Sequence, residues 1–323
     1  MTIVRADDAA ITRAVELLRA GELVGLPTET VYGLAADAGN AAAVRKMFAA
    51  KGRPADHPVI VHLAHAQQIR DWAIDVPPAA HALAARFWPG PMTLILKRAA
   101  HVLDAVTGGQ DTVGLRVPSQ PVAHALLARF GGGVAAPSAN KFGRVSPTTA
   151  QHVLDEFGDA VELVLDGGAC EFGIESTIVD CTGAAPRILR PGGVSTAMIA
   201  AALGELRSVN VGAAAPRVSG SLEAHYAPRT RALLVATDQI ESTLRANRDK
   251  PIALLSRMSP HFAPRWRWEA ASAAGPYAHA LYATLRAMDA VGADLIVIEQ
   301  PPRGADWEAV NDRLRRAAFG SGS

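Results

Sequence analysis

The alternation of short apolar runs with helical periods constrains the fold of this chain more than any other feature. Runs such as 59–63 and 93–96 are typical of buried strands, whereas 8–20 and 121–130 carry apolar residues at helical spacing. Strands that alternate with helices in this way are typical of an α/β domain. The sequence therefore predicts an α/β fold, with one large domain in residues 1–205.

The same alternation returns near the C-terminus and predicts a second, smaller domain. Between residues 206 and 230 the periodicity fades into small residues and prolines, which indicates a linker or mobile loop. Strand-like and helix-like segments resume in 231–319, enough for a small α/β domain of three or more strands. We expect the last four residues, 320–323, to be disordered. A chain of 323 residues also favours two cores over one.

Composition argues against several classes of protein. Lys plus Arg number 32 against 31 Asp plus Glu, and a net charge of +1 argues against a broadly basic surface for nucleic acid. The net charge does not exclude a local basic groove. The two cysteines are too few for a disulfide scaffold or a zinc cluster. We find neither a signal peptide nor an apolar run of membrane-spanning length, so we expect a cytoplasmic protein without a membrane partner.

Three polar side chains, Thr28, Glu29 and Thr30, lie just after the strand-like run 23–26. Open α/β sheets bind ligands at the carboxyl ends of their strands, so this loop is a candidate small-molecule site. A turn whose threonines satisfy loop backbone groups explains the same residues. Taken alone, this stretch slightly favours the turn.

Cations recur where helices and strands end. Lys51 and Arg53 follow a helical stretch, where they could complement the helix dipole or clamp an anion together with His57 and His62. Arg116 lies inside an otherwise apolar strand. A buried arginine needs a partner, which could be a substrate carboxylate, a phosphate or an internal acid. The sequence leaves these alternatives open.

Hydroxyl groups and a further cation complete the candidate set. Ser138, Asn140 and Ser146 surround a glycine, Ser176 enters a strand and Arg190 ends one. Such groups suit phosphate or ribose oxygens, although the Walker pattern is absent. No Ser-His-Asp or Cys-His arrangement is compelling, and the histidines show no metal spacing. Cations and hydroxyls without a nucleophile favour phosphoryl or nucleotidyl transfer.

Read in order, the motifs resemble those of the threonylcarbamoyl-AMP synthase family, in its long Sua5 form rather than the single-domain YrdC form. The motifs are PTETVYGL, KGRP, PVIVHL, WPGPMTLIL, VGLRVP, PSAN, SPT, ESTIVD, ILRPG and HYAP. The resemblance spans nearly the whole chain. It implies a YrdC-like twisted mixed sheet with helices in 1–205, a linker or lid carrying HYAP in 206–230, and a smaller Rossmann-like Sua5-type α/β domain in 231–319.

The resemblance implies a nucleotidyltransferase activity. L-threonine and bicarbonate would form a carbamate whose oxygen attacks the α-phosphorus of ATP and releases pyrophosphate. Mg²⁺ would be held through the ATP phosphates, without a protein metal site. The product, L-threonylcarbamoyladenylate, would supply the downstream tRNA threonylcarbamoyl transferase machinery that makes t6A at position 37. The resemblance also leaves weak binding of tRNA or other RNA open.

Site residues are assigned by the resemblance, motif by motif. The threonine site would be lined by Thr30, His62, Arg116, Ala136 and Ser176. ATP would be contacted by Arg53, His57, Thr112, Ser138, Ser146, Arg190 and Tyr226. Lys51 and Arg53 would act in catalysis, and Arg116 would bind the substrate carboxylate.

Two alternative functions come from other classes. An RNA-binding or ribosome-assembly protein without turnover is opposed by the near-neutral charge and by the absence of aromatic RNA-binding motifs. A carbamoyltransferase of hydrogenase maturation would need paired Cys-x-x-Cys zinc fingers, which two lone cysteines cannot build. A salt-sensitive RNA shift without ATP turnover would favour the first alternative.

Overall fold

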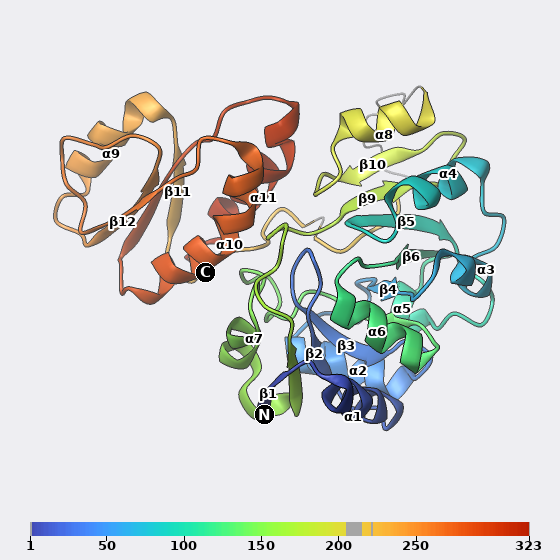
Figure 1. The fold of residues 1–323 in the computed structure, drawn as a ribbon. Helices are drawn as coiled ribbons and strands as arrows, with labels where there is room; N and C mark the ends of the chain where they lie inside the picture. Colours follow the sequence, from blue (N-terminus) through green and yellow to red (C-terminus); the bar gives the residue numbers. More distant parts are fainter. Residues whose placement is uncertain (1, 205–214, 221, 323) are drawn as a thin grey trace. The chain divides into compact units, whose positions relative to one another are not determined.

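The computed structural model describes residues 2–204, 215–220 and 222–322 (Figure 1). The chain divides into two compact units. The first comprises Met1–Phe142 and Pro147–Ser221, and the second comprises Gly143–Ser146 and Leu222–Ser323. The predicted linker 206–230 is thereby split at residue 222, because 215–220 belong to the first unit. Residues 206–214 and 221 of that region lie outside the described residues.

In the described part of the first unit, ten strands form one mixed sheet, as predicted. Its spatial order is β1-β8-β2-β3-β7-β4-β6-β5-β9-β10. β4 and β6 are parallel, whereas β5 runs antiparallel to β6. The strands are β1 (Thr2–Arg5), β2 (Val24–Leu26), β3 (Gly33–Asp37), β4 (Ile60–His62), β5 (Met92–Lys97), β6 (Thr112–Arg116), β7 (Val134–Ala135), β8 (Leu163–Asp166), β9 (Thr177–Asp180) and β10 (Arg187–Arg190).

α2 shows how capping residues set the ends of a helix in the first unit. Asn40 caps α2 by accepting hydrogen bonds from the amides of Ala42 and Ala43, and Gly52 ends it in the left-handed conformation, with φ of 65°. The helices are α1 (Asp8–Arg19), α2 (Ala41–Lys51), α3 (Ile69–Trp72), α4 (Pro78–Phe87), α5 (Asp104–Thr107), α6 (Pro121–Phe130), α7 (Ala150–Phe157) and α8 (Thr196–Leu203).

Apolar side chains cover both faces of this sheet. Alternate residues of a strand point to opposite faces, so Leu34 of β3 packs in the cluster that includes Met47 of α2. Its neighbour Ala35 packs in the other cluster, with Leu18 of α1 and Leu126 of α6. With both faces buried, the polar side chains of the first unit are left to the edges where strands end.

The second unit is the predicted smaller α/β domain, with a parallel sheet in the order β11-β14-β12-β13. β12 and β14 are buried along their whole length, as expected for central parallel strands. The strands are β11 (Ala232–Val235), β12 (Ile252–Ser256), β13 (Trp266–Glu269) and β14 (Leu295–Glu299), and the helices are α9 (Ile240–Ala246), α10 (Ala274–Ala290) and α11 (Glu308–Gly320).

The expectation of a disordered tail is wrong for residues 320–322. Gly320 ends α11, and the Oγ of Ser321 accepts a hydrogen bond from the amide of Ala232 at 2.8 Å. Ser321 thus follows the end of α11 and contacts β11 of the sheet.

Within the described ranges, no helix combines the length and apolar character that crossing a bilayer needs.

Gly192 allows a close approach of two backbone segments near the start of β9. A Cβ on Gly192 would lie 2.4 Å from the carbonyl oxygen of Glu175 and 2.4 Å from the amide nitrogen of Thr177. Backbone atoms cannot rotate away as a flexible side chain can. The two glycines of the RPGG motif are therefore not simply a flexible turn.

We expect Gly192→Ala to lower the free energy of unfolding by about 1–3 kcal/mol, the usual cost of overpacking. Urea denaturation would measure the change. Gly183→Ala is the matched control, because the nearest atom to its added Cβ would be 3.8 Å away. Equal stability of the two variants would contradict a tight approach at Gly192.

Candidate functional site

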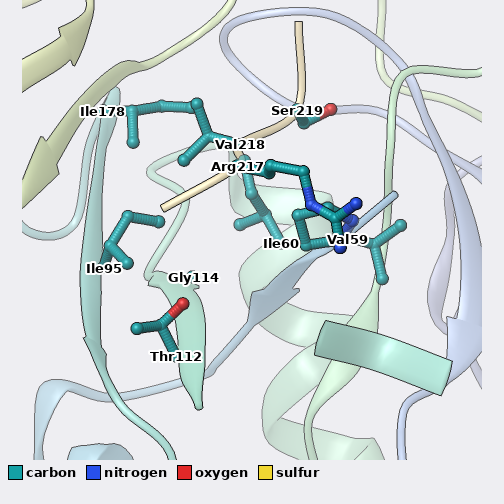
Figure 2. A pocket seen from close by; sticks show the side chains of 10 residues that line it. Val59, Ile60, Ile95, Thr112, Gly114, Ile178, Arg217, Val218 and Ser219 are labelled. Carbon is teal, nitrogen blue, oxygen red and sulfur yellow. The ribbon is translucent and has the colours of Figure 1, made fainter. Parts of the chain in front are cut away.

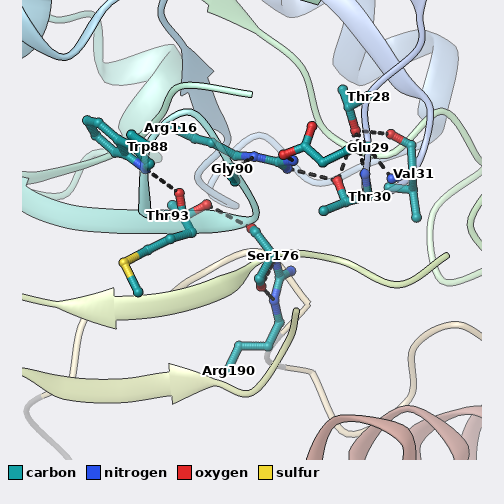
Figure 3. Close-up of polar contacts among 11 residues, drawn as sticks. Thr28, Glu29, Thr30, Val31, Trp88, Gly90, Thr93, Arg116, Ser176 and Arg190 are labelled. Atoms are coloured by element: carbon teal, nitrogen blue, oxygen red, sulfur yellow. Dashed lines mark hydrogen bonds and ion pairs between the residues drawn. The ribbon is translucent and has the colours of Figure 1, made fainter. Parts of the chain in front are cut away.

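The loop between β2 and β3 is buried. One of its three polar side chains bonds to the loop backbone, and the other two bond to Arg116. The Oγ1 of Thr28 donates to the carbonyl of Val31 at 2.6 Å and accepts from the amides of Thr30 and Val31. For Thr28, the interpretation as a turn residue is therefore correct. Glu29 and Thr30 instead direct their side chains toward Arg116 (Figure 3).

Arg116 ends β6 in a buried ion pair. Its Nη2 donates to the Oε1 of Glu29 at 2.6 Å, and its Nη1 donates to the Oγ1 of Thr30 at 2.9 Å. Nε donates to the carbonyl of Gly90 at 3.3 Å. The internal acid that the sequence left open is thus Glu29. Two of the five guanidinium N–H groups make no hydrogen bond with the residues that the structure describes.

His62 ends β4, directly beside Arg116 in the parallel register. Its side chain is buried, and its Nδ1 has no hydrogen-bond partner among the described residues. Burial, and secondly the charge of Arg116, lower the pKa of His62 to about 3. The ring is therefore neutral at physiological pH. Ala136 follows β7, and its amide donates to the carbonyl of Ile60 at 3.1 Å.

Ser176 and Arg190 form a second buried group just before β9. The Oγ of Ser176 lies 2.8 Å from the Oγ1 of Thr93, and Arg190 donates to both the Oγ and the carbonyl oxygen of Ser176. Thr93, in β5, was missed by the sequence analysis because it lies within an apolar strand. Nη1 of Arg190 also donates to the carbonyl of Ser219 at 2.9 Å.

Strand direction brings these two groups to one edge of the sheet. The neighbours β4, β6, β5 and β9 are consecutive in the sheet. β4 and β6 end where β5 and β9 begin, because β5 is antiparallel to β6 and parallel to β9. His62, Arg116, Thr93 and Ser176 therefore line one edge, and Figure 3 shows the last three together with Thr30.

Lys51 connects two of the sequence motifs. Its Nζ donates to the carbonyl oxygens of Ser138 and Asn140, each at 2.5 Å. The side chain therefore turns inward instead of staying in solvent at the end of α2. Burial, and then the charge of Arg53, hold the pKa of Lys51 well below its usual value. Asn140, which the sequence analysis grouped with Ser138 without a role, contributes through its backbone.

Arg53 and His57 surround the ring of Phe142. The guanidinium carbon of Arg53 lies 5.8 Å from the centre of that ring, and Nη2 of Arg53 donates to the carbonyl of Pro58 at 2.8 Å. The ring of His57 meets Phe142 edge-on at 5.3 Å. Burial, and secondly the charge of Arg53, lower the pKa of His57.

Thr112 lies apart from the residues predicted to bind threonine, because it is at the opposite end of β6 from Arg116. The two residues are four positions apart in an extended strand, which corresponds to about 13 Å. Thr112 lines a small pocket instead, shown in Figure 2. Val218 packs there against Ile95 and Ile178, so part of the predicted linker lies along this sheet.

Ser146 and Tyr226 belong to the second unit. The carbonyl of Ser146 accepts from the Nε of Arg286 at 3.3 Å. Tyr226 is buried, with a left-handed backbone (φ 61°), and its ring stacks on that of Tyr282 at 5.7 Å. Their assignment to ATP stays a prediction.

The chemistry of this edge is that of charge and hydrogen bonding. Both cysteines are buried, and burial raises the pKa of each thiol to about 12, so neither is a ready nucleophile. In the part of the chain that the structure describes, no group of three His, Cys, Asp or Glu side chains could hold a metal. The arrangement suits an anionic or zwitterionic ligand.

Two family models match the chain. The Sua5/YciO/YrdC model, described as "Telomere recombination", matches residues 16–192. A model described as "Threonylcarbamoyl-AMP synthase, C-terminal domain" matches residues 194–319.

Curated relatives and solved structures are similar along nearly the whole chain. A threonylcarbamoyl-AMP synthase of Pyrococcus abyssi is 37% identical, covering 97% of this chain and 95% of the relative. One of Bacillus subtilis is 36% identical, with coverages of 97% and 94%. The crystal structure of P. abyssi Sua5 complexed with L-threonine superposes with a TM-score of 0.92 at 34% identity, covering 99% of this chain and 98% of that one.

The pKa of His62 predicts a specific sensitivity to acid. Between pH 6.5 and about 3 the unfolded chain binds a proton at this position that the native chain does not. Stability must therefore fall as pH falls through this window, by up to about 1.4 kcal/mol per pH unit for one proton. We expect His62→Gln to show a shallower decline of the free energy of unfolding between pH 6.5 and 4.

Urea denaturation at a series of pH values would measure the slopes. His81→Gln, which changes an exposed histidine of α4, is the control and should keep the wild-type slope. A wild-type slope in His62→Gln would mean that the histidine titrates normally in the native protein.

Proposed function

Because the chain belongs to the threonylcarbamoyl-AMP synthase family of the Sua5 type, we propose that it makes L-threonylcarbamoyl-AMP from L-threonine, bicarbonate and ATP. The observation that carries the proposal is the near-full-length likeness to a Sua5 structure complexed with L-threonine. The edge formed by His62, Arg116 and Ser176 supports it with groups that suit an amino acid.

The amino acid would bind at the buried ion pair. Arg116 retains two N–H groups for the substrate carboxylate, and a planar guanidinium can hold it by two hydrogen bonds. The hydroxyls of Thr30 and Ser176 and the neutral ring of His62 would pair with the threonine hydroxyl, and Ala136 would contact its methyl group. Valine would then be rejected because it leaves these buried polar groups unpaired.

The triphosphate would bind to the cations of the KGRP and RPGG motifs. Lys51 and Arg53 would stabilise charge on the phosphates as the carbamate oxygen attacks the α-phosphorus and pyrophosphate leaves. An anion beside Lys51 favours its protonated form, which offsets the effect of burial. His57, Thr112, Ser138 and Arg190 would contact other parts of ATP.

Magnesium would reach this site with the nucleotide. Among the residues that the structure describes, Glu29 is not joined by further His, Cys, Asp or Glu side chains in a group that could hold a metal, which fits an ion bound through phosphate oxygens and water. When bound, the ion would neutralise phosphate charge. The adenylate is a reactive mixed anhydride, so it would have to pass to an acceptor. We propose that this acceptor is tRNA, through the machinery that forms t6A.

We expect pyrophosphate release from ATP to require L-threonine and bicarbonate together, because neither alone can form the carbamate. Serine should be poorer by roughly 1–3 kcal/mol, since it lacks one methyl contact. A pyrophosphate assay, with mass spectrometry of the adenylate, would measure both. Equal release without any amino acid, or RNA binding without turnover, would refute the proposal.

Two arginine variants should separate binding from chemistry. Arg116→Lys keeps the charge beside Glu29 but loses the planar fork, so KM for threonine should rise by roughly 10- to 100-fold. Arg53→Ala should mainly lower kcat, because its charge acts on developing phosphate charge. Arg98→Ala, which breaks an ion pair with Asp104 elsewhere, is the control. The reverse pattern would mean that the two substrates are exchanged.

A further inference from the structure

Glu29 carries a buried carboxylate oxygen that the protein does not satisfy. Its Oε1 accepts from Arg116, whereas its Oε2 has no hydrogen-bond partner among the residues that the structure describes. The side chain is 2% exposed. A buried anionic oxygen without a donor is costly, and native proteins rarely keep one without a reason.

Neutralisation of Arg116 does not explain this geometry. An arginine and a carboxylate that pair only with each other usually form two parallel hydrogen bonds, which use both oxygens. Here the second terminal nitrogen of Arg116 bonds to Thr30 instead. One carboxylate oxygen and two guanidinium N–H groups of the ion pair thus make no hydrogen bond with the residues that the structure describes, and Figure 3 shows the bonds that the pair does make.

These remaining groups match an α-amino acid. Its carboxylate is complementary to the N–H groups of Arg116, and its ammonium is complementary to the Oε2 of Glu29. The two charged groups of the ligand are joined through one carbon, and the two protein groups belong to one ion pair, in which Nη2 of Arg116 lies 2.6 Å from Oε1 of Glu29. A zwitterion on an ion pair also adds no net charge to a buried site.

We propose that Glu29 is a binding and positioning residue whose Oε2 accepts a hydrogen bond from the amino nitrogen of the substrate. The inference rests on the proposed function, and it adds a residue that sequence motifs did not assign. The carbamate formed from the amine still carries one N–H. The same oxygen can therefore hold the nitrogen before and after carboxylation, and keep the carbamate directed toward ATP.

The test compares two ligands that differ in the amine. Calorimetry on the full chain would give the affinity of L-threonine, and competition would give that of (R)-3-hydroxybutanoate, which lacks the amine. In Glu29→Gln, threonine should bind roughly 10- to 100-fold more weakly, as for a lost hydrogen bond to a charged group. The affinity of (R)-3-hydroxybutanoate should stay near that of the wild type.

A purely structural role predicts a different result. If Glu29 only holds Arg116 in place, both ligands weaken by the same factor, and the proposal is overturned. Asp180→Asn is the matched control, because Asp180 is a buried acid of the same unit in an ion pair with Arg187. It should bind both ligands as the wild type does.

Glu29→Asp is a second variant, for the case in which Glu29→Gln does not fold. It keeps the charge that compensates Arg116 but withdraws the oxygen by one carbon, so it should show the same selective loss of threonine affinity. Unchanged threonine affinity in both variants would refute this inference alone. A wild-type protein that does not bind threonine would refute the proposed function instead.

Discussion

The buried ion pair between Arg116 and Glu29 is the interaction on which the arrangement of the site depends. Glu29 lies in the loop between β2 and β3, whereas Arg116 ends β6, and β7 and β4 separate β3 from β6 in the sheet. The ion pair therefore joins the loop to a strand that is three positions away from β3 in the sheet. Because an unpaired buried charge is strongly destabilising, the pair holds the loop against the side chain of Arg116.

A second feature is the way in which cations are held. Lys51 donates to two carbonyl oxygens, and Arg190 donates to the carbonyl of Ser176. A carbonyl oxygen orients a cation without neutralising it, whereas a carboxylate would do both. The backbone thus orients both side chains, which is the preorganisation that stabilisation of phosphate charge requires.

The sequence predicted what depends on local pattern. Apolar periodicity predicted the α/β class and the second domain, and turn chemistry correctly described Thr28. It could not choose a partner for Arg116, because Glu29 lies 87 positions away and many acids were available. The same distance in sequence hid the contact of Lys51 with Ser138. Nor could it assign Gly143–Ser146 to the second unit, since four residues carry no periodicity.

That assignment bears on the modularity of the protein. Gly143–Ser146 pairs with the second unit through the bridge between Arg144 and Ala227 and through Arg286, so the backbone passes from one unit to the other three times. Neither unit is a continuous piece of the gene. Removal of the C-terminal part would leave these four residues without the surface on which they pair. Recombination at this boundary would have to be accompanied by refolding of the loop that follows the PSAN motif.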